Sequence, residues 1–429
     1  MLLFLAGCKK AGGTAAAKEP DTIKIGATIT TEGAFAAFGV TFGNFYRAMI
    51  DYVNEAPEYA DILKGRKIVP TIYDDKGDGA TAKTYVEKLI NDDKVFALVG
   101  IIGTWSVVAA KDVLETCAIP SVYYGTGTSA QLFEPAVGDQ RYMMGVQPQY
   151  KTEGRLMYLR ASTMFDDVKK IGVIYSNADD GISLQSGIAA QYALDTRANK
   201  PAIVYQQISS SNASEIASQI QAIQDCDVIL AAGNQAYFKA TYTAAFANAR
   251  TKSRPFITSY VNAAASIMPP EATQSGAATI YSAGWITLGE KGDTPESVRR
   301  LAEIGEYWKI IDWDTKWIPA AEKQSYKFNG YPMCAYVALK TFLVGIDRLN
   351  KSGKPLTAEN YLEAMESERI PLALSGGVDY KDGNRIGVDA LTFIKYQPPA
   401  DPNDTPDKGA FIEVDAFTSI GDLVASLSQ

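Results

Sequence analysis

The sequence of 429 residues contains no histidine. This absence excludes Ser-His-Asp and Cys-His catalysis and removes the commonest side-chain ligand for transition metals. Carboxylates, lysines and tyrosines remain available for acid–base chemistry. Because no ordinary side chain here titrates near neutral pH, the composition favours a binding protein over an enzyme, and we expect neither a cofactor nor a metal.

Cysteine is scarce, and long apolar runs are missing. The four cysteines are Cys8, Cys117, Cys226 and Cys334. The last three follow no disulfide spacing and lie in or beside apolar segments, so we expect free thiols that pack as small hydrophobes. No run of about 18 apolar residues could span a membrane as a helix. The net charge of −8 argues against nucleic-acid binding, which needs a basic face.

What the chain does contain, from residue 22 onward, is an alternation of short apolar runs with segments of helical periodicity. The expected strands are 23–29, 67–73, 95–100, 119–124, 170–175, 202–208, 227–232 and 255–259. The expected intervening helices are 40–55, 80–92, 105–116, 181–195, 213–224 and 235–249. Such alternation produces parallel sheets covered by helices on both faces. We therefore predict an α/β fold with two doubly wound, Rossmann-like lobes.

The domain boundaries follow from a break in this alternation at residues 131–168 and from a different C-terminal part. That part has helical patterns at 296–311, 329–350 and 358–367 and ends in strands near 377–380 and 390–396. This part does not continue the alternation of strands and helices, so we expect it to pack on both lobes. The chain would then cross between the lobes several times, which creates a hinge. We predict a tail at 1–20, a lobe 1 of 21–146 plus about 284–355, and a lobe 2 of 147–283 plus about 356–429.

The candidate site lies at the strand tips, because ligands of open parallel sheets bind beyond the carboxyl ends of the strands. The loops 30–39, 101–106 and 125–130 are rich in glycine and hydroxyl residues. Thr104 would open a helix whose unpaired N–H groups and dipole favour a carboxylate. Thr126 and Thr128 could offer a carbonyl and a hydroxyl to an ammonium group. The alternative is that these hydroxyl residues are only helix caps or turn residues.

Several segments, in order, resemble one protein family. They are "IKIG" at 23–26 with Gly33 and "FG" at 38–39, "YDD" at 73–75, "LVG" at 98–100, "IP" at 119–120, "TGT" at 126–128, "KKIGVIYSNADDG" at 169–181 and "LSGGVDYKDGNR" at 374–385. Together they resemble the type I periplasmic binding proteins of ABC importers, particularly the branched-chain amino acid (Leu/Ile/Val)-binding family. The resemblance covers nearly all of the chain after residue 21. It implies two lobes that close on a small molecule and dock on ABC permease subunits.

In lobe 1 the resemblance implies roles for single residues. Thr104 matches a hydroxyl residue that binds the carboxylate of an amino acid. Thr126 and Thr128 match positions that hold the carboxylate and ammonium groups. Phe38 matches an aromatic residue that covers the ligand side chain, and Trp105 would add a further large apolar surface.

In lobe 2 the sequence departs from the family pattern. Asp180 and Asn234 stand where tyrosines are usual, and Tyr260 stands where a glutamate would pair with the ligand ammonium. Asp180 either supplies the missing negative charge or caps the helix predicted at 181–195. In the first case Trp105, Phe38 and Tyr260 favour an amino acid with a large or aromatic side chain. In the second, an aromatic or aliphatic carboxylic acid or a small amide becomes the expected ligand.

Two other functions fit the same sequence. A sensory lipoprotein without a transporter would have the same cleft, and the sequence does not separate it from a solute receptor. An enzyme could use Asp179, Asp180 and Glu32 as acids or bases, but paired carboxylates are common on solvated loops. We expect a protein that is not an enzyme.

The N-terminal tetrapeptide "LAGC" at residues 5–8 resembles the lipobox of bacterial lipoproteins. A lipid on Cys8 would leave residues 9–20 as a tether and place the folded protein outside the cytoplasm, attached to a membrane through the anchor alone. Residues 1–6 are shorter than a working signal peptide, so we expect the true start to lie upstream. The alternative is a chance cysteine in a frayed tail.

Overall fold

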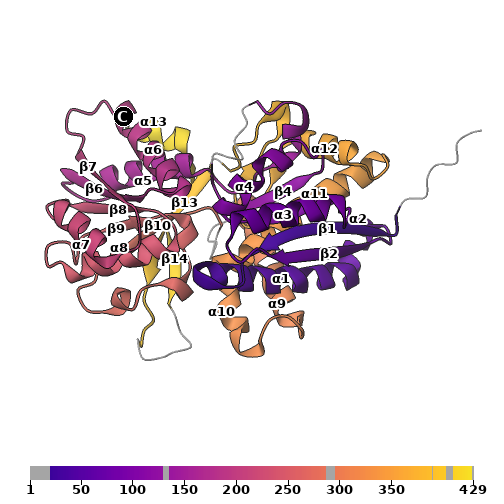
Figure 1. Cartoon of the computed structure of the whole chain (residues 1–429), viewed down its shortest axis with the longest axis horizontal. Helices are drawn as coiled ribbons and strands as arrows, with labels where there is room; N and C mark the ends of the chain where they lie inside the picture. Colours follow the sequence, from indigo (N-terminus) through magenta and orange to yellow (C-terminus); the bar gives the residue numbers. More distant parts are fainter. Residues whose placement is uncertain (1–19, 129–134, 287–294, 389, 402–408, 428–429) are drawn as a thin grey trace, which may run out of the picture.

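The computed structural model describes residues 20–128, 135–286, 295–388, 390–401 and 409–427, which form two α/β lobes (Figure 1). Lobe 1 contains a five-stranded parallel sheet. Its strands, in spatial order, are β2 (Lys67–Asp74), β1 (Thr22–Ile29), β3 (Ala97–Ile102), β4 (Ser121–Gly125) and β5 (Met143–Met144). Its helices are α1 (Ala36–Glu55), α2 (Ala60–Leu63), α3 (Gly79–Asn91), α4 (Thr104–Leu114), α9 (Pro295–Trp313), α10 (Lys323–Lys327), α11 (Gly330–Ser352) and α12 (Ala358–Glu366).

Lobe 2 contains a seven-stranded mixed sheet. Its strands, in spatial order, are β14 (Ala410–Ser419), β13 (Ala390–Gln397), β10 (Ile280–Gly284), β9 (Phe256–Thr258), β8 (Val228–Ala232), β6 (Lys170–Ser176) and β7 (Ala202–Ile208). The strands β6, β7, β8, β9 and β10 pair in parallel, whereas β13 is antiparallel to both of its neighbours. The helices are α5 (Tyr150–Thr163), α6 (Asp179–Leu194), α7 (Ala213–Ala222), α8 (Gln235–Ala247) and α13 (Ile420–Leu427).

Alternate side chains along the buried strands pack on opposite faces of each sheet, as the pleat requires. In β3, Val99 packs toward α1 and α11, whereas Leu98 packs toward α3 and α4. In β8, Leu230 and Ile229 likewise pack on opposite faces of the sheet, where they belong to two different hydrophobic clusters. Each fully buried side chain of this kind stabilises the fold by about 1.5–3 kcal/mol relative to exposure. The predicted doubly wound α/β architecture is therefore confirmed.

The parallel parts of both sheets have the same strand order, in which the first strand lies between the second and the third. The winding direction of lobe 1 therefore reverses between β1 and β3, and that of lobe 2 reverses between β6 and β8. Such switch points leave a crevice at the carboxyl ends of the strands. The loops that follow these four strands are where the functional site is built.

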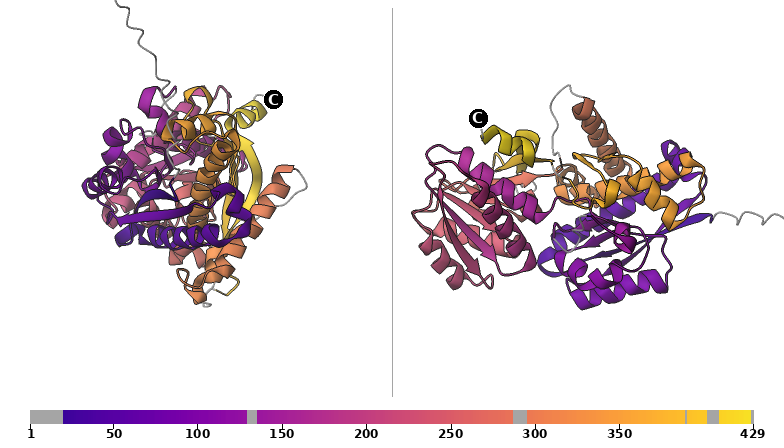
Figure 2. Two further views of the ribbon diagram at one scale, coloured as in Figure 1. Left: turned by 90° about the vertical axis from the view of Figure 1, so that its right-hand side faces the viewer. Right: turned by 90° about the horizontal axis from the view of Figure 1, so that it is seen from above.

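The chain passes between the lobes after β5, after β10 and before β13, so the connection is a hinge of several segments. The C-terminal third is divided: α11 and α12 lie on lobe 1, whereas β13, β14 and α13 lie on lobe 2 (Figure 2). The expected assignment of residues from about 356 to lobe 2 is wrong for α12. Tyr361 packs its ring on Phe96 and donates its hydroxyl to the Phe342 carbonyl, both in lobe 1.

Several elements lie where the sequence predicted none. Helix α5 occupies part of the break expected at 131–168, and β5, β10 and β14 extend the two sheets. Cys117, Cys226 and Cys334 are free thiols, as expected. Of the helices in the described part of the chain, none combines the length and apolar character that a membrane span requires. Cys8 and the expected tether fall outside the described residues, except for Pro20.

Candidate ligand-binding site

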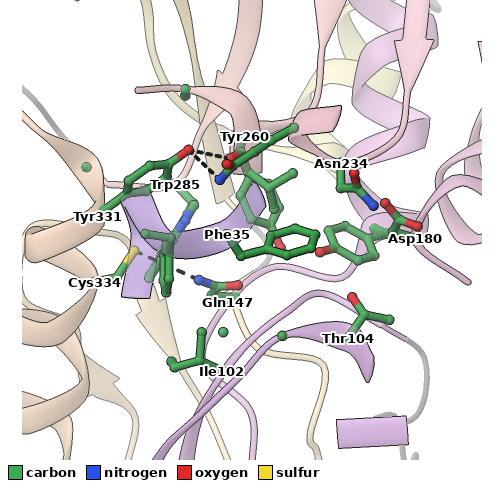
Figure 3. Close-up of a pocket in the computed structure, with 18 of the residues that line it drawn as sticks. Phe35, Ile102, Thr104, Gln147, Asp180, Asn234, Tyr260, Trp285, Tyr331 and Cys334 are labelled. Carbon is green, nitrogen blue, oxygen red and sulfur yellow. Dashed lines mark hydrogen bonds between the residues drawn. The ribbon is translucent and has the colours of Figure 1, made fainter. Parts of the chain in front are cut away.

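A cavity of about 250 Å³ lies between the lobes and is lined by residues from both (Figure 3). Lobe 1 contributes side chains that follow β1 and β3, among them Phe38, Thr104 and Trp105. Lobe 2 contributes residues that follow β6, β8 and β9, among them Asp180 and Asn234. The cavity therefore joins the switch points of the two sheets.

Six of the eight predicted ligand-binding residues line this cavity: Phe38, Thr104, Trp105, Asp180, Asn234 and Tyr260. The other two, Thr126 and Thr128, are buried behind it and are not among the lining residues. The Oγ1 atoms of Thr126 and Thr104 are 2.8 Å apart, and the Thr128 N–H donates to Thr126 Oγ1 at 3.0 Å. The structure thus places Thr126 and Thr128 behind the cavity, where they orient Thr104, and the expectation that both touch the ligand stays a prediction.

Thr104 begins α4, and the local backbone leaves that helix end open. Gly103 is the N-cap with φ of 102°, a conformation that favours glycine, and no side chain caps the helix. The first N–H groups of α4 are consequently available to an anion, and the helix dipole reinforces this preference. The indole Nε1 of Trp105, in the same turn, is a buried donor with no hydrogen-bond partner. This end of the cavity is rich in donors.

Asp180 lies in the first turn of α6 and is 4% exposed. The N-cap of α6 is Ala178, so the alternative that Asp180 caps this helix is wrong. Oδ1 accepts a long bond of 3.4 Å from the Ser176 hydroxyl, while the buried Oδ2 has no partner. Burial raises the pKa of the Asp180 carboxyl, and backbone N–H groups of Gly181 and Asn234 oppose this effect. The site therefore presents one buried carboxylate oxygen that lacks a donor.

Asn234 and Tyr260 also line the cavity, and the side-chain oxygen of each already has a partner within the protein. The Asn234 side chain caps α8 by accepting from the Ala236 N–H at 3.2 Å. The Tyr260 hydroxyl donates to the Pro148 carbonyl at 2.8 Å. The Tyr260 ring stacks on Tyr150, with 5.9 Å between ring centroids. Tyr260 thus supplies an apolar wall.

The Tyr260 backbone is fixed by Glu153, a fully buried residue of α5. Its carboxylate accepts from the Tyr260 N–H and from the Ser259 hydroxyl, the latter at 2.7 Å. Burial raises the pKa of Glu153 to about 8, and these two hydrogen bonds only partly oppose the effect. Glu153 therefore holds the loop after β9 against α5.

The sequence missed the residues that come from the lobe crossings and from α11. Gln147 and Tyr150 lie in and beside the crossing after β5, Trp285 follows β10, and Tyr331 and Cys334 open α11. None of these positions follows a predicted strand, so the strand-tip rule could not select them. Tyr331 packs on Phe38 with 4.9 Å between ring centroids, which joins α11 to the predicted aromatic wall.

The two ends of the cavity differ in chemistry. Figure 3 shows Thr104, Asp180 and Asn234 at one end and Gln147, Cys334 and Tyr331 at the other, with the Phe35 ring between them. Asp179 and Asp180 are the only charged residues among those that line the cavity. Within the described residues, no group of three or more acidic or cysteine side chains could hold a metal ion.

Comparisons with known proteins agree with this geometry. The family model for "Periplasmic binding protein" matches residues 22–400. No curated protein sequence matches the chain significantly.

Solved structures with the same fold cover almost all of the chain. A fatty acid ABC transporter substrate-binding protein from Thermomonospora curvata is 17% identical, with a TM-score of 0.69 and coverage of 93% of this chain and 92% of its own. A possible leucine/isoleucine/valine-binding protein from Rhodopirellula baltica SH 1 is 14% identical, with a TM-score of 0.69 and coverage of 96% and 100%. An ABC transporter solute-binding protein from R. palustris, in complex with 4-hydroxybenzoate, is 16% identical, with a TM-score of 0.69 and coverage of 93% and 98%.

Proposed function

The chain belongs to the periplasmic binding protein family, and from this premise we propose that it is the solute-binding component of an ABC importer that binds an amino acid between its lobes. The proposed ligand has a large apolar or aromatic side chain. The protein acts by binding and closure, without catalysis, and its macromolecular partners are ABC permease subunits.

The observation that carries the amino acid proposal is the pairing of opposite chemistries at one end of the cavity. The open N-terminus of α4 and the Thr104 hydroxyl suit a carboxylate. The unpartnered Oδ2 of Asp180, on the opposite lobe, suits an ammonium group. The α-carboxylate and α-ammonium groups of an amino acid are bonded to the same carbon atom, so one head group carries both charges to this end of the cavity. A zwitterion would therefore bridge the lobes and favour the closed state.

The rest of the cavity suits a bulky side chain. Its walls include Phe35, Trp105, Tyr260, Trp285 and Tyr331. An apolar cavity of about 150 Å³ accepts benzene. The volume of about 250 Å³ here therefore accommodates an aromatic ring together with the polar head of an amino acid.

A carboxylic acid without an amino group is the second candidate. It is favoured by the solved structures whose printed names mention a fatty acid or 4-hydroxybenzoate. It is disfavoured by Asp180, since an ionised carboxylate would repel the ligand and nothing would satisfy Oδ2. A small amide and a sensory role without transport fit the same cavity, and the binding assays below separate the ligand classes.

We also propose that Cys8 carries a lipid anchor that holds the protein at a membrane outside the cytoplasm. The proposal rests on the sequence "LAGC" at residues 5–8. The chain expressed in bacteria with a complete signal peptide leading into "LAGC" and with labelled palmitate should incorporate the label, whereas its Cys8→Ser form should not. Equal labelling of both forms would contradict the anchor.

The amino acid proposal is tested by isothermal titration of the protein with the standard amino acids. We expect binding of one or more large apolar or aromatic members, and we expect Asp180→Asn to weaken it about 10- to 100-fold, since hydrogen bonds to charged groups contribute about 1.5–3 kcal/mol. Asp166→Asn is the control, because Asp166 is an exposed carboxylate of lobe 2 that does not line the cavity. The absence of heat and of any thermal shift with every amino acid would contradict the proposal.

A further inference from the structure

Two buried glutamines at the other end of the cavity are not explained by the recognition of an amino acid head group. Gln147 is 3% exposed and Gln235 is 5% exposed, and both line the cavity. Gln147 comes from the crossing after β5, whereas Gln235 is the first residue of α8. Buried polar groups normally have hydrogen-bond partners, so each exception calls for an explanation.

Each glutamine is held by a tyrosine through its amide nitrogen. Gln147 Nε2 donates to the Tyr123 hydroxyl at 2.6 Å, and Gln235 Nε2 donates to the Tyr331 hydroxyl at 2.8 Å. The single proton of Tyr331 goes to the Val261 carbonyl at 3.1 Å, so Tyr331 can only accept from Gln235. The nitrogen of the Gln235 amide, and not its oxygen, therefore faces the Tyr331 hydroxyl.

In both residues the carbonyl oxygen is left without a partner. Gln147 Oε1 and Gln235 Oε1 are buried, and neither accepts a hydrogen bond. Figure 3 shows the Gln147 amide with its nitrogen toward Cys334 and its oxygen toward the middle of the cavity. Two oriented acceptors among the residues that line a ligand cavity suit a ligand that brings a donor to this end.

The surroundings exclude a charged donor. The groups that face the two amides are the Tyr123 and Tyr331 hydroxyls and the Cys334 thiol. Burial raises the pKa of Cys334 to about 12, so this thiol stays neutral. A lysine-like ammonium placed here would have no counter-ion, and burying an unpaired charge is unfavourable.

We propose that Gln147 and Gln235 form a neutral acceptor subsite that selects ligands with an uncharged hydroxyl or N–H donor at the tip of the side chain. This inference rests on the proposed function, because the amino acid head group at Thr104 and Asp180 directs the side chain toward the glutamines. With aromatic walls between the two ends, the ligand class is a phenolic amino acid, for which L-tyrosine is the probe. L-phenylalanine fills the same walls but leaves both carbonyls unpaired.

The test compares L-tyrosine and L-phenylalanine by isothermal titration. The wild-type protein should bind L-tyrosine at least about tenfold more tightly, since sites built to bond a hydroxyl reject the analogue that lacks it. Gln147→Met and Gln235→Met, which keep side-chain length and remove the acceptor, should each reduce the ratio of the two affinities. Gln147→Met should leave L-phenylalanine binding unchanged or stronger, whereas Gln235→Met also loses the bond to Tyr331 and should weaken the binding of both amino acids. Circular dichroism checks that both variants fold.

The outcomes separate the two proposals. If L-phenylalanine binds the wild type as tightly as L-tyrosine does, the subsite is overturned while the amino acid site stands, and no variant is needed to reach this result. If another amino acid binds tightly while neither L-tyrosine nor L-phenylalanine binds, the subsite is also overturned while the amino acid site stands. An unchanged ratio in both methionine variants also overturns the subsite. If no amino acid binds, the proposed function fails, and the subsite falls with it.

Discussion

At the scale of single residues, the protein separates groups that touch the ligand cavity from groups that hold them in place. Thr104 and Asp180 face the cavity, whereas Thr126, Thr128 and Glu153 act from behind it. Position in sequence predicts the first kind, because strand tips converge at a switch point. It does not predict the second kind, because Thr104 lies 22 residues from Thr126 and Tyr260 lies 107 residues from Glu153 along the chain.

The buried Glu153 predicts an unusual dependence of stability on pH. Its pKa is about 8 in the folded protein and close to 4.5 when exposed, so between these values the folded state keeps a proton that the unfolded state loses. This contribution to stability is complete below about pH 4.5 and is lost as the pH rises through about 8. Each unit of pKa difference corresponds to about 1.4 kcal/mol.

Glu153→Gln should remove this dependence and still accept from the Tyr260 N–H. Because the chain has no histidine, no imidazole titrates in this window. Urea denaturation at pH 5.5, 7 and 8.5 should show the wild type losing stability relative to the variant as the pH rises. A constant difference in the free energy of unfolding would show that Glu153 does not titrate in this range.

The sequence predicted Thr104 and Asp180 in the cavity because each follows a clear strand and opens a helix. It also predicted ligand contacts for Thr126 and Thr128, which follow a strand but are not among the lining residues, since side-chain direction at a strand tip is set by local backbone geometry. It missed Gln147 altogether, because nothing in a five-residue crossing between lobes predicts its burial.

At the scale of secondary-structure elements, the pair α5 and α6 supports the lobe 2 side of the site. Tyr150 opens α5 and Asp180 lies in the first turn of α6. The helices touch through glycines: a Cβ at Gly154 would lie 2.1 Å from the Leu184 carbonyl oxygen, and one at Gly187 would lie 2.1 Å from that of Lys151. Such contacts with backbone atoms cannot be relieved by a side-chain rotation.

Gly187→Ala should therefore separate the two helices. We expect a loss of about 1–3 kcal/mol in the free energy of unfolding, as for overpacked cores, together with weaker ligand binding because Asp180 moves. The matched control is Gly305→Ala in α9, where a Cβ meets nothing within 4 Å. The control should gain up to about 1 kcal/mol from helix propensity. Equal stability changes in the two variants, measured by urea denaturation, would contradict the close packing.

The same pair shows why element prediction was incomplete. The buried face of α5 includes Glu153 and Gly154, which interrupt the apolar periodicity, so the helix was read as part of a break. Strand β14 was not predicted because only one of its ten residues is fully buried, so it has no continuous apolar run. The strands β1, β3, β6 and β8 were found because both of their faces are buried under helices, which requires continuous apolar runs.

At the scale of the whole molecule, Tyr331 connects the lobes. It belongs to α11 on lobe 1, while its hydroxyl contacts Gln235 and Val261 on lobe 2. These two hydrogen bonds exist only when the lobes are close together, so they contribute to the balance between open and closed states. The division of the C-terminal third between the lobes, which the sequence predicted only in outline, creates this contact.

Tyr331→Phe should shift the ligand-free protein toward the open state. Small-angle X-ray scattering should give a larger radius of gyration than the wild type without ligand and the same radius at saturating ligand. Affinity should fall about 5- to 30-fold, since each neutral hydrogen bond contributes roughly 1 kcal/mol. An unchanged radius and affinity would indicate that the contact has no part in closure.

The most direct test of the account is a comparison of one ligand pair by isothermal titration. The pair consists of the tightest-binding L-amino acid and its analogue with hydrogen in place of the α-ammonium group. We predict that the analogue binds the wild type at least about tenfold more weakly, because only the amino acid satisfies Asp180 Oδ2. Equal or tighter binding of the analogue would contradict the proposal that the two lobes meet around an amino acid.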